Sequence, residues 1–454
     1  MRVVSSAVCL LLALAPQALS AQQAEAPPAA AADAAPGDAT AAEAAESKVP
    51  LEEIRRFVAV YNAVKQAYVD PVDDHKLMQS AVRGLLSDLD PHSTYFDKED
   101  AEAFDEQATG AYDGIGVELQ QQPDNTLKVI APIDDTPAAR AGIRAGDVIV
   151  AIDGKPIANV DGMEPLRGKS GTQVVLTLTR QGRDKPFDVT VKRETIRVTS
   201  VRSRMLEPGY GYVRISTFQA DTGNDFGKNV AQLQAQAGGH LRGLVLDLRS
   251  NPGGLLTAAV QVADDLLDRG TIVTTRGRIA VSDTEFDATA GDILDGAPVV
   301  VLVDAGSASA AEVLAAALHD NHRARLLGSR TFGKGSVQTV LPLDNGDSVK
   351  LTTARYYTPS GKSIQAAGIV PDVVLKPDHV DPEESEALAD YSEASLPGHL
   401  RGDAEGDGGY APGDVLPGDG PITAALAELK HPGATARPAA TAPAGKARRP
   451  APAK

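Results

Sequence analysis

The sequence predicts a multidomain α/β protein with an N-terminal helical segment, a small inserted β domain, a layered α/β core and a disordered C-terminal tail. The first reason is length, because 454 residues correspond to two or three domains of about 150 residues each. The second is composition, because 43% hydrophobic residues can form cores and exclude a wholly disordered chain. The third is the apolar spacing, which changes along the chain from helical to strand-like and then to alternating strands and helices.

The beginning of the chain has the features of a targeting segment followed by a linker. Residues 1–21 contain Arg2, an apolar run over residues 3–16 and then small residues, as in a secretory signal peptide. That run is short for a membrane span, and no later stretch reaches about 18 uninterrupted apolar residues. Residues 22–47 form an Ala/Pro-rich linker. We expect an exported, periplasmic protein that is soluble after signal cleavage, with membrane association through an uncleaved signal as the alternative.

Charge and cysteine content exclude several classes of function. The formal net charge is −17, from 44 Lys and Arg against 61 Asp and Glu, so binding through nucleic-acid phosphates is not expected. Cys9 is the only cysteine, and it lies in the signal peptide. The mature chain should therefore have no disulfide, no cysteine-based zinc site and no catalytic thiol. Any nucleophile must be an oxygen or a nitrogen.

Residues 48–108 are predicted to be mainly helical. Apolar residues recur at spacings of three and four over residues 51–64 and 77–89, which is typical of amphipathic helices. Asp70-Pro71 separates the two helices, because proline disfavours a helical conformation in the residue before it. Their apolar surface is larger than one thin layer needs, so we expect these helices to pair with another subunit in a homo-oligomer.

Residues 109–195 combine short β runs with turns. Three phrases occur in order, namely YDGIGV at 112–117, TPAARAGI at 136–143 and GDVIVAIDG at 146–154. In these phrases the stretch resembles a PDZ domain. A glycine-bracketed loop exposes backbone N–H groups that can hold a peptide's terminal carboxylate, and the following strand adds the peptide as an extra strand. The peptide-binding residues expected on this basis are Gly114, Ile115, Gly116 and Val117.

Residues 196–376 are predicted to form a layered α/β domain. Continuous apolar runs indicate strands that are buried on both faces, with helices between them. The expected strands are 212–215, 244–248 and 298–303, and the expected helices are 221–236 and 255–267. After this domain, residues 377–454 are rich in Glu, Asp, Gly, Pro and Ala. We expect them to be largely disordered apart from a short helix at 422–430.

The segment 304–312 carries the candidate nucleophile. Its small residues lie directly after a buried strand and before a helix, where the backbone can turn tightly and expose one side chain. The N–H groups at the start of that helix can stabilise negative charge on an acyl oxygen. Ser309 is the candidate, and Ser307 is a competitor that the local sequence alone does not exclude.

The candidate base is Lys334, in TFGKGSVQ at residues 331–338. None of the eight histidines lies in a familiar triad setting, whereas a lysine buried among apolar groups loses proton affinity and can accept the serine proton. Gln338 is placed to orient the amine. Residues 328–334 also match the start of a phosphate-binding loop, but Gly335 stands where the magnesium-binding Ser or Thr is needed, so nucleotide binding is not expected.

Three segments together resemble the signatures of the carboxyl-terminal processing peptidases. They are DLRSNPGG at 247–254, GSASAAE at 306–312 and TFGKGSVQ at 331–338. The resemblance covers about residues 51–375. It implies a PDZ domain inserted ahead of a crotonase-like α/β catalytic core that works without a metal or nucleotide cofactor.

The same resemblance assigns roles to individual residues. It makes Ser309 the nucleophile, Lys334 the general base and Gln338 the orienting amide. It also implies an oxyanion hole from the backbone N–H of Ala310 and of one glycine, with Gly253 and Gly254 as the two choices. Arg167 resembles the arginine that links the PDZ domain to the active site, and His92 is interpreted as a structural residue of its turn.

These features predict an exported serine endopeptidase that captures protein C-terminal tails on its PDZ domain and hydrolyses them with a Ser-Lys dyad. Its expected partners are protein substrates with exposed apolar C-terminal tails, an adaptor protein and further copies of itself, but not nucleic acid. A PDZ-based binding or scaffold protein with an inactive protease-like domain is the first alternative. The second is a crotonase-like hydrolase or isomerase acting on thioesters, which leaves the PDZ domain unexplained.

Overall fold

The structure is a computed structural model that describes residues 50–122, 126–157, 164–377, 391–403, 405 and 410–432. The expected signal peptide and linker lie outside these residues. The chain falls into two compact units, one up to Leu77 and one from Met78, and each is described by itself. In the described part, no helix has both the length and the apolar character needed to cross a membrane.

The first unit contains helix α2 (Leu51–Ala67) and the beginning of α3 (Asp74–Ser87). These are the two amphipathic helices that the apolar spacing predicted. Asp74 connects them, because its carboxylate accepts hydrogen bonds from Tyr61 at 2.9 Å and from Lys65 at 2.7 Å. No residue of α2 is buried, and five of its apolar side chains are exposed: Leu51, Ile54, Phe57, Val58 and Val60.

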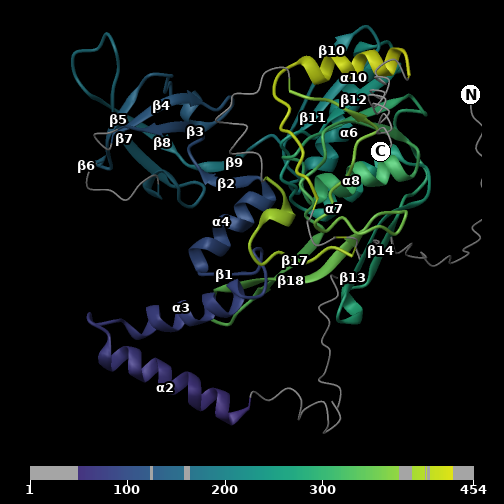
Figure 1. Ribbon diagram of the computed structural model, residues 1–454. Coiled ribbons are helices and arrows are strands. Elements are labelled where there is room, and N and C mark those ends of the chain that lie inside the picture. Colours follow the sequence, from purple (N-terminus) through teal and green to yellow (C-terminus); the bar gives the residue numbers. More distant parts are fainter. Residues whose placement is uncertain are drawn as a thin grey trace, which may run out of the picture. The chain divides into compact units, whose positions relative to one another are not determined.

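The small β domain has the strand order β3-β4-β5-β7-β8, with β6 paired to β5, and all of its pairs are antiparallel (Figure 1). Its strands are β3 (Val117–Gln121), β4 (Leu127–Pro132), β5 (Val148–Ile152), β6 (Lys155–Pro156), β7 (Gln173–Thr179) and β8 (Phe187–Lys192), with α5 (Pro137–Arg140) and η2 (Glu164–Leu166) between them. The alternating burial of β7 gives the sheet one core face. A ribbon of β2 (Ala111–Gly114) and β9 (Glu194–Arg197) flanks the domain. The strand β3 lies at the edge of the sheet.

The core domain is built on a second sheet with the order β10-β11-β12-β15-β16-β19. The strands are β10 (Val201–Glu207), β11 (Tyr210–Ile215), β12 (Gly243–Asp247), β15 (Val299–Val303), β16 (Ala324–Gly328) and β19 (Val373–Val374). The β10–β11 pair is antiparallel, and the other pairs are parallel. All residues of β12 and β15 are buried, which confirms the prediction of strands covered on both faces.

Helices cover both faces of this sheet (Figure 1). The helices α6 (Thr222–Gln236), α7 (Leu256–Leu266) and α8 (Ala310–Asp320) pack on one face, and α10 (Gly420–Lys430) packs on the other. Alternate residues of one strand face opposite layers, so Leu244 and Leu246 join the first core and Val245 joins the second. The structure therefore confirms the predicted layered α/β architecture.

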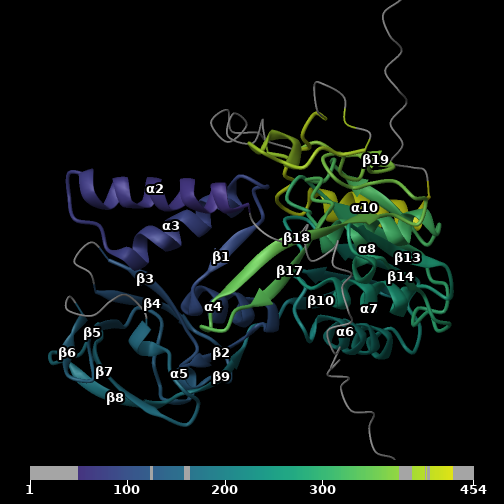
Figure 2. The same cartoon turned by 90° about the horizontal axis from the view of Figure 1, so that it is seen from below.

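A third sheet lies beside the core domain. It contains β1 (Thr94–Phe96), β13 (Thr271–Gly277), β14 (Thr284–Asp287), β17 (Ser336–Pro342) and β18 (Ser348–Tyr357), with η3 (Ala280–Ser282) between β13 and β14. In Figure 2, β17 and β18 form a long hairpin that extends from the core toward β1. Helix α4 (Lys98–Thr109) follows β1, and Asp97 caps it by accepting a hydrogen bond from the Asp100 N–H.

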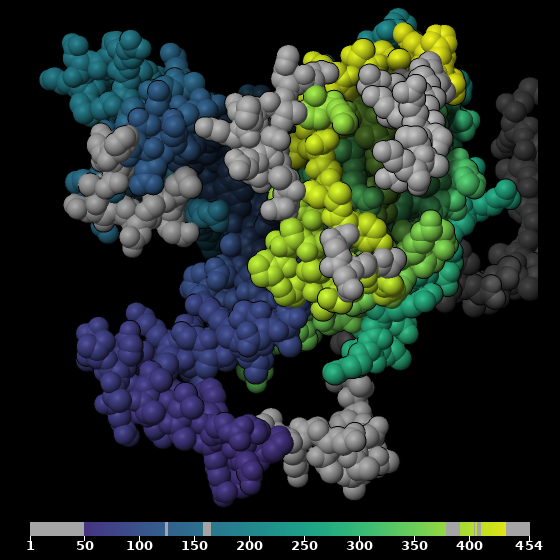
Figure 3. Space-filling model, viewed as in Figure 1, coloured from purple at the N-terminus to yellow at the C-terminus, as the bar shows by residue number. Residues whose placement is uncertain are grey.

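The C-terminal region differs from the expectation of a largely disordered tail. The helix expected at 422–430 is α10, but residues 391–403 and 410–419 also pack against the core, and the chain there runs across its surface in Figure 3. The Leu416 N–H donates to Asp304 at 3.2 Å, and Arg249 donates to the Leu416 carbonyl at 2.6 Å. Composition did not predict this packing, because a few well-placed residues make it within a polar stretch.

We expect Leu429→Ala to lower the free energy of unfolding by about 2–4 kcal/mol, because Leu429 is buried between α10 and the sheet. Chemical denaturation of the full chain measures the change. Val281→Ala is the matched control, since Val281 is 82% exposed, and it should change stability by less than about 0.5 kcal/mol. Equal stability of both variants would contradict the assignment of α10 to the core.

Candidate active site

Ser309 occupies the turn between β15 and α8. Its backbone has φ +55° and ψ −117°, a conformation that residues other than glycine rarely adopt. The side chain is 7% exposed and lines a pocket of about 410 Å³. This strand–turn–helix geometry presents the hydroxyl to the pocket beside the first N–H groups of α8.

Ser307 is placed quite differently from Ser309. It is fully buried, and its hydroxyl donates to the Leu248 carbonyl at 2.8 Å while accepting from the Asp304 N–H at 3.0 Å. It is not among the residues that line the pocket. The structure therefore gives Ser307 a packing role in the turn and leaves Ser309 as the serine that faces the pocket.

Lys334 lines the same pocket as Ser309. Burial lowers the pKa of Lys334, and the nearby positive charge of Lys350 lowers it further. The carboxylates of Glu393, Glu312 and Asp90 act in the opposite direction. The net shift is downward, which increases the fraction of neutral amine able to accept a proton.

Glu312 connects the turn that carries Ser309 (the serine turn) with residues 331–335 around Lys334 (the lysine loop), a role that was not predicted from the sequence. Its buried carboxylate accepts from the Ser309 N–H at 2.8 Å, the Gly333 N–H at 2.8 Å and the Lys334 N–H at 2.9 Å. Thr331 donates a further hydrogen bond. Burial raises the pKa of Glu312 to about 7, although all four hydrogen bonds favour the carboxylate. The spacing Ser309-x-x-Glu312, typical of a capping box, was the available sequence signal.

Gln338 lies on β17 and also lines the pocket. Its amide nitrogen donates to Ser336 at 3.0 Å and to Thr352 at 3.2 Å. Thr352 in turn donates to Asp90 at 3.1 Å, in the turn before β1. These contacts hold the amide in place and direct its nitrogen away from any role as a donor to Lys334.

The turn 252–254 lies against the nucleophile. Gly253 has φ +102°, and a Cβ there would lie 2.9 Å from the Ser309 Cβ and 3.1 Å from the Ala310 nitrogen, so only glycine fits. The Gly253 N–H already donates to the Asn251 side chain at 2.9 Å. Gly253 and Gly254 both line the pocket of Ser309.

Three further side chains of the pocket were not anticipated. Tyr356 forms a side-chain hydrogen bond with Ser309, and burial raises its pKa to about 12. The Lys350 amine lies 5.3 Å and 5.5 Å from the ring centres of Phe96 and Phe104, and burial lowers its pKa. Phe104 brings α4 to the pocket. These residues carry no local motif, because strands and helices distant in sequence bring them together.

The residues predicted to bind peptide form the loop between β2 and β3. Gly116 has φ +74°, and a Cβ there would lie 2.4 Å from the Thr136 Cβ, so the close approach requires glycine. The carbonyls of Ile115 and Gly116 accept from Ala138 and Ile133 at 2.8 Å and 3.0 Å. In the described residues, the edge strand β3 that begins at Val117 pairs only with β4, and its other edge could accept an added strand. This loop is separate from the pocket of Ser309.

Arg167 lies just after η2 and contacts α4. Its guanidinium forms an ion pair with Glu106 of α4 and lies 5.6 Å from the ring centre of Tyr112. The same helix contributes Phe104, Gln107 and Ala108 to the pocket of Ser309. The structure thus connects Arg167 with one wall of the pocket.

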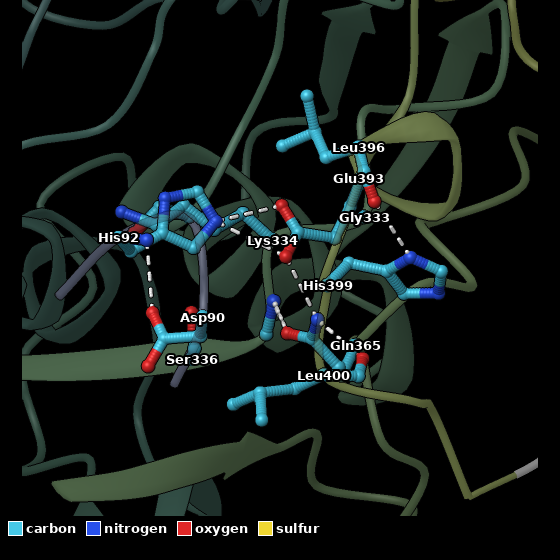
Figure 4. Close-up of polar contacts among 12 residues, drawn as sticks. Asp90, His92, Gly333, Lys334, Ser336, Gln365, Glu393, Leu396, His399 and Leu400 are labelled. Carbon is cyan, nitrogen blue, oxygen red and sulfur yellow. Dashed lines mark hydrogen bonds and ion pairs between the residues drawn. The ribbon is translucent and has the colours of Figure 1, made fainter. Parts of the chain in front are cut away.

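His92 is held in its turn by backbone and side-chain contacts. Its backbone N–H donates to Asp90 at 2.8 Å, and its ring pairs with the buried Glu393 carboxylate at 2.9 Å (Figure 4). It is absent from the residues that line the pocket, in keeping with a structural role. Among the described residues, no cluster of three or more His, Cys, Asp or Glu has an arrangement suited to a metal ion.

Comparison with known proteins defines the class. The family model for peptidase family S41 matches residues 209–375, the model for the PDZ domain matches residues 114–191, and the model for the activating protease CtpB N-terminal domain matches residues 18–100. The chain is therefore a PDZ-containing peptidase of family S41, in agreement with the fold and the pocket described above.

Individual relatives narrow this class. A carboxy-terminal-processing protease of Bartonella bacilliformis is 42% identical over 373 residues, covering 81% of this chain and 85% of that protein. The carboxy-terminal processing protease CtpA of Bacillus subtilis is 36% identical and covers 69% of this chain and 67% of its own length. The solved photosystem II D1 C-terminal processing protease is 32% identical, with 78% of this chain and all of that one covered and a TM-score of 0.43. The chain belongs to the carboxy-terminal processing protease family.

The raised pKa of Glu312 predicts a pH dependence of stability. Between about pH 4.5 and pH 7, folded Glu312 keeps a proton that the unfolded chain releases, so its contribution lowers the free energy of unfolding as pH rises. Glu312→Gln should flatten this decline. It should also cost about 1–3 kcal/mol at pH 5, because the amide NH2 faces backbone donors. Urea unfolding at pH 5 and pH 7 tests this, and identical pH slopes in both proteins would contradict it.

Proposed function

We propose that this peptidase is an exported serine endopeptidase that cleaves protein substrates with a dyad of Ser309 and Lys334. The observation that carries the proposal is one pocket lined by a serine on a strained strand–helix turn and by a lysine whose pKa is lowered. A neutral amine that shares a pocket with a serine hydroxyl can replace the histidine of a triad. The Glu312 carboxylate supports the proposal because it holds the backbones of both residues.

The reaction then follows a two-step acyl transfer. The neutral Lys334 amine takes the Ser309 proton as Oγ attacks the substrate carbonyl carbon, and the carbonyl electron pair moves to its oxygen. As the peptide C–N bond breaks, the Lys334 ammonium gives the proton to the leaving amine. Water, deprotonated by the same amine, then attacks the ester carbonyl carbon; the bond to Ser309 Oγ breaks, the carboxylic acid product leaves, and the Lys334 ammonium returns the proton to Oγ. The Gln338 amide oxygen is the atom suited to receive a hydrogen bond from Lys334.

The oxyanion would be stabilised by two backbone N–H groups. The Ala310 N–H, at the start of α8, is one of them. We assign the second to Gly254, since the Gly253 N–H is already engaged by Asn251. The close contact between the glycine turn and Ser309 supports this placement.

The PDZ domain would select substrates. The loop from Gly114 to Val117 and the open edge of β3 have the features that bind a C-terminal tail as an added strand. An apolar tail fits the apolar interior behind β3. Arg167 would couple tail binding to the pocket through Glu106 and α4.

The proposal also includes export of the protein, its assembly into a homo-oligomer and the delivery of substrates by an adaptor. The signal-like residues 1–21 support a periplasmic location, and the exposed apolar side chains of α2 support pairing with a second subunit. An adaptor protein that delivers substrates is a further expected partner. The alternative, a PDZ scaffold with an inactive protease-like domain, gives no reason for a lysine of lowered pKa in the pocket of Ser309.

The dyad is tested with mature protein and an unfolded substrate that ends in an apolar tail. Wild type should cleave it in EDTA without nucleotide, whereas Ser309→Ala and Lys334→Ala should each lose at least about a thousand-fold in kcat and stay folded. Cleavage products are followed by mass spectrometry. Tail binding without cleavage by the wild type would favour the scaffold, and cleavage by Ser309→Ala would refute the assignment of the nucleophile.

Arg167→Ala tests the coupling between the PDZ domain and the pocket. We expect stimulation of cleavage by tail peptides to fall several-fold, while the peptide Kd changes by less than about two-fold, because Arg167 contacts α4 rather than the peptide loop. Fluorescence anisotropy gives the Kd, and peptide-stimulated kcat/KM gives the activity. Arg140→Ala is the matched control, since Arg140 pairs with Glu194 instead. Equal losses of binding and stimulation in Arg167→Ala would make Arg167 a plain ligand contact.

A further inference from the structure

We propose that residues 391–403 position the catalytic lysine loop through the buried carboxylate of Glu393 and the amide of Gln365. The proposal rests on the Ser-Lys function proposed above and makes Glu393 a positioning residue of that reaction. The C-terminal segment that composition had predicted to be disordered thereby becomes part of the active-site scaffold.

Both backbone and side-chain hydrogen bonds hold the lysine loop, and the side-chain bonds fix the N–H groups of Gly333, Lys334 and Gly335. Residues 331–335 lie between β16 and β17 and have no strand ladder of their own. On one side, Glu312 binds the N–H groups of Gly333 and Lys334. On the other side, the Gly335 N–H donates to the Gln365 Oε1 at 3.0 Å. A Cβ at position 335 would lie 2.2 Å from the backbone nitrogen of Gln365, so the lysine loop and the backbone at Gln365 are in close contact.

Gln365 is itself held by the C-terminal segment. Its Nε2 donates to the Glu393 Oε1 at 2.9 Å and to the Leu400 carbonyl at 2.8 Å. The Glu393 N–H donates directly to the Phe332 carbonyl at 2.9 Å, and the ring of Tyr391 packs edge-on against Phe332 with 5.2 Å between centres. Four separate contacts therefore connect this segment with Gln365 and Phe332 beside the lysine loop.

Burying the Glu393 carboxylate costs free energy of folding, and packing alone does not explain why a carboxylate occupies this position. The side chain is 0% exposed, and Figure 4 shows its carboxylate between His92 and Gln365. Replacing a buried ion pair by apolar residues is often neutral or stabilising, so such a pair is weak evidence for a purely stabilising role. What this pair does achieve is a fixed orientation of Gln365, and through it of the Gly335 backbone next to Lys334.

The negative charge of Glu393 also acts on the Lys334 amine. Four charged groups act on that amine: Lys350 from β18 lowers its pKa, and Glu312 from α8, Asp90 from the turn before β1 and Glu393 raise it. Removing the Glu393 charge should move the pKa of Lys334 further down. The acidic limb of the pH profile of kcat/KM would then move to lower pH, a readout that a merely structural role would not change.

Glu393→Gln in the full chain is the test. We expect kcat to fall about ten-fold or more, while KM stays within about two-fold. The reason is that the variant loses the negative charge and places an NH2 group where one of the two oxygens lay close to the His92 ring or the Gln365 amide, so the contact to Gln365 and the loop shift. The acidic limb should move to lower pH. Gln365→Leu keeps the Glu393–His92 pair and removes the acceptor of the Gly335 N–H, so it should lower kcat similarly without moving that limb.

Glu428→Gln is the matched control. Glu428 is also a buried, ion-paired carboxylate of the C-terminal region, but it pairs with Arg325 on the other face of the sheet. It should keep the wild-type kcat and pH limb. The proposal would be overturned if Glu393→Gln kept both the wild-type kcat and the wild-type acidic limb of the pH profile. It would also be overturned if Gln365→Leu kept the wild-type kcat. Both outcomes count only if Lys334→Ala is inactive. Activity of Lys334→Ala would instead refute the proposed dyad.

Discussion

One buried carboxylate determines the geometry of this active site. Glu312 lies in the first turn of α8 and accepts hydrogen bonds from the backbones on both sides of the pocket, at Ser309 and at Lys334. A carboxylate with only one of these partners would leave a desolvated charge uncompensated, which is a large cost. The serine turn and the lysine loop are therefore constrained together, although about 25 residues of chain separate them.

Support for the pocket comes from segments that precede and follow the core domain in the sequence. The turn before β1 holds Gln338 through Asp90 and Thr352, and its His92 pairs with Glu393 of the C-terminal segment. Helix α4 brings Phe104 to the pocket and Glu106 to Arg167. The parallel sheet supplies a rigid frame, and these outer segments orient the groups that react.

The sequence allowed prediction of the architecture, and it indicated the residues that we propose to react, because both depend on local patterns. Buried strands have continuous apolar runs, and Ser309 and Lys334 lie in motifs. Glu312, Tyr356 and Glu393 were missed because each acts through contacts made only in the folded chain. The structured C-terminal segment was missed because composition averages over a window in which a few residues, such as Leu416 and Glu393, make the decisive contacts.

The central claim is that Glu312 fixes the backbones of Ser309 and Lys334 so that the serine hydroxyl and a neutral lysine amine share one pocket. The rate at which a fluorophosphonate labels Ser309 tests this claim most directly. Intact-mass and peptide-mapping spectrometry on the wild type should find one adduct, on Ser309, that forms faster as pH rises through the lowered pKa of Lys334. In Lys334→Met, which keeps an apolar stem, labelling should slow by at least about a hundred-fold. An adduct on another serine, such as Ser307, or an unchanged rate in Lys334→Met, would contradict the account.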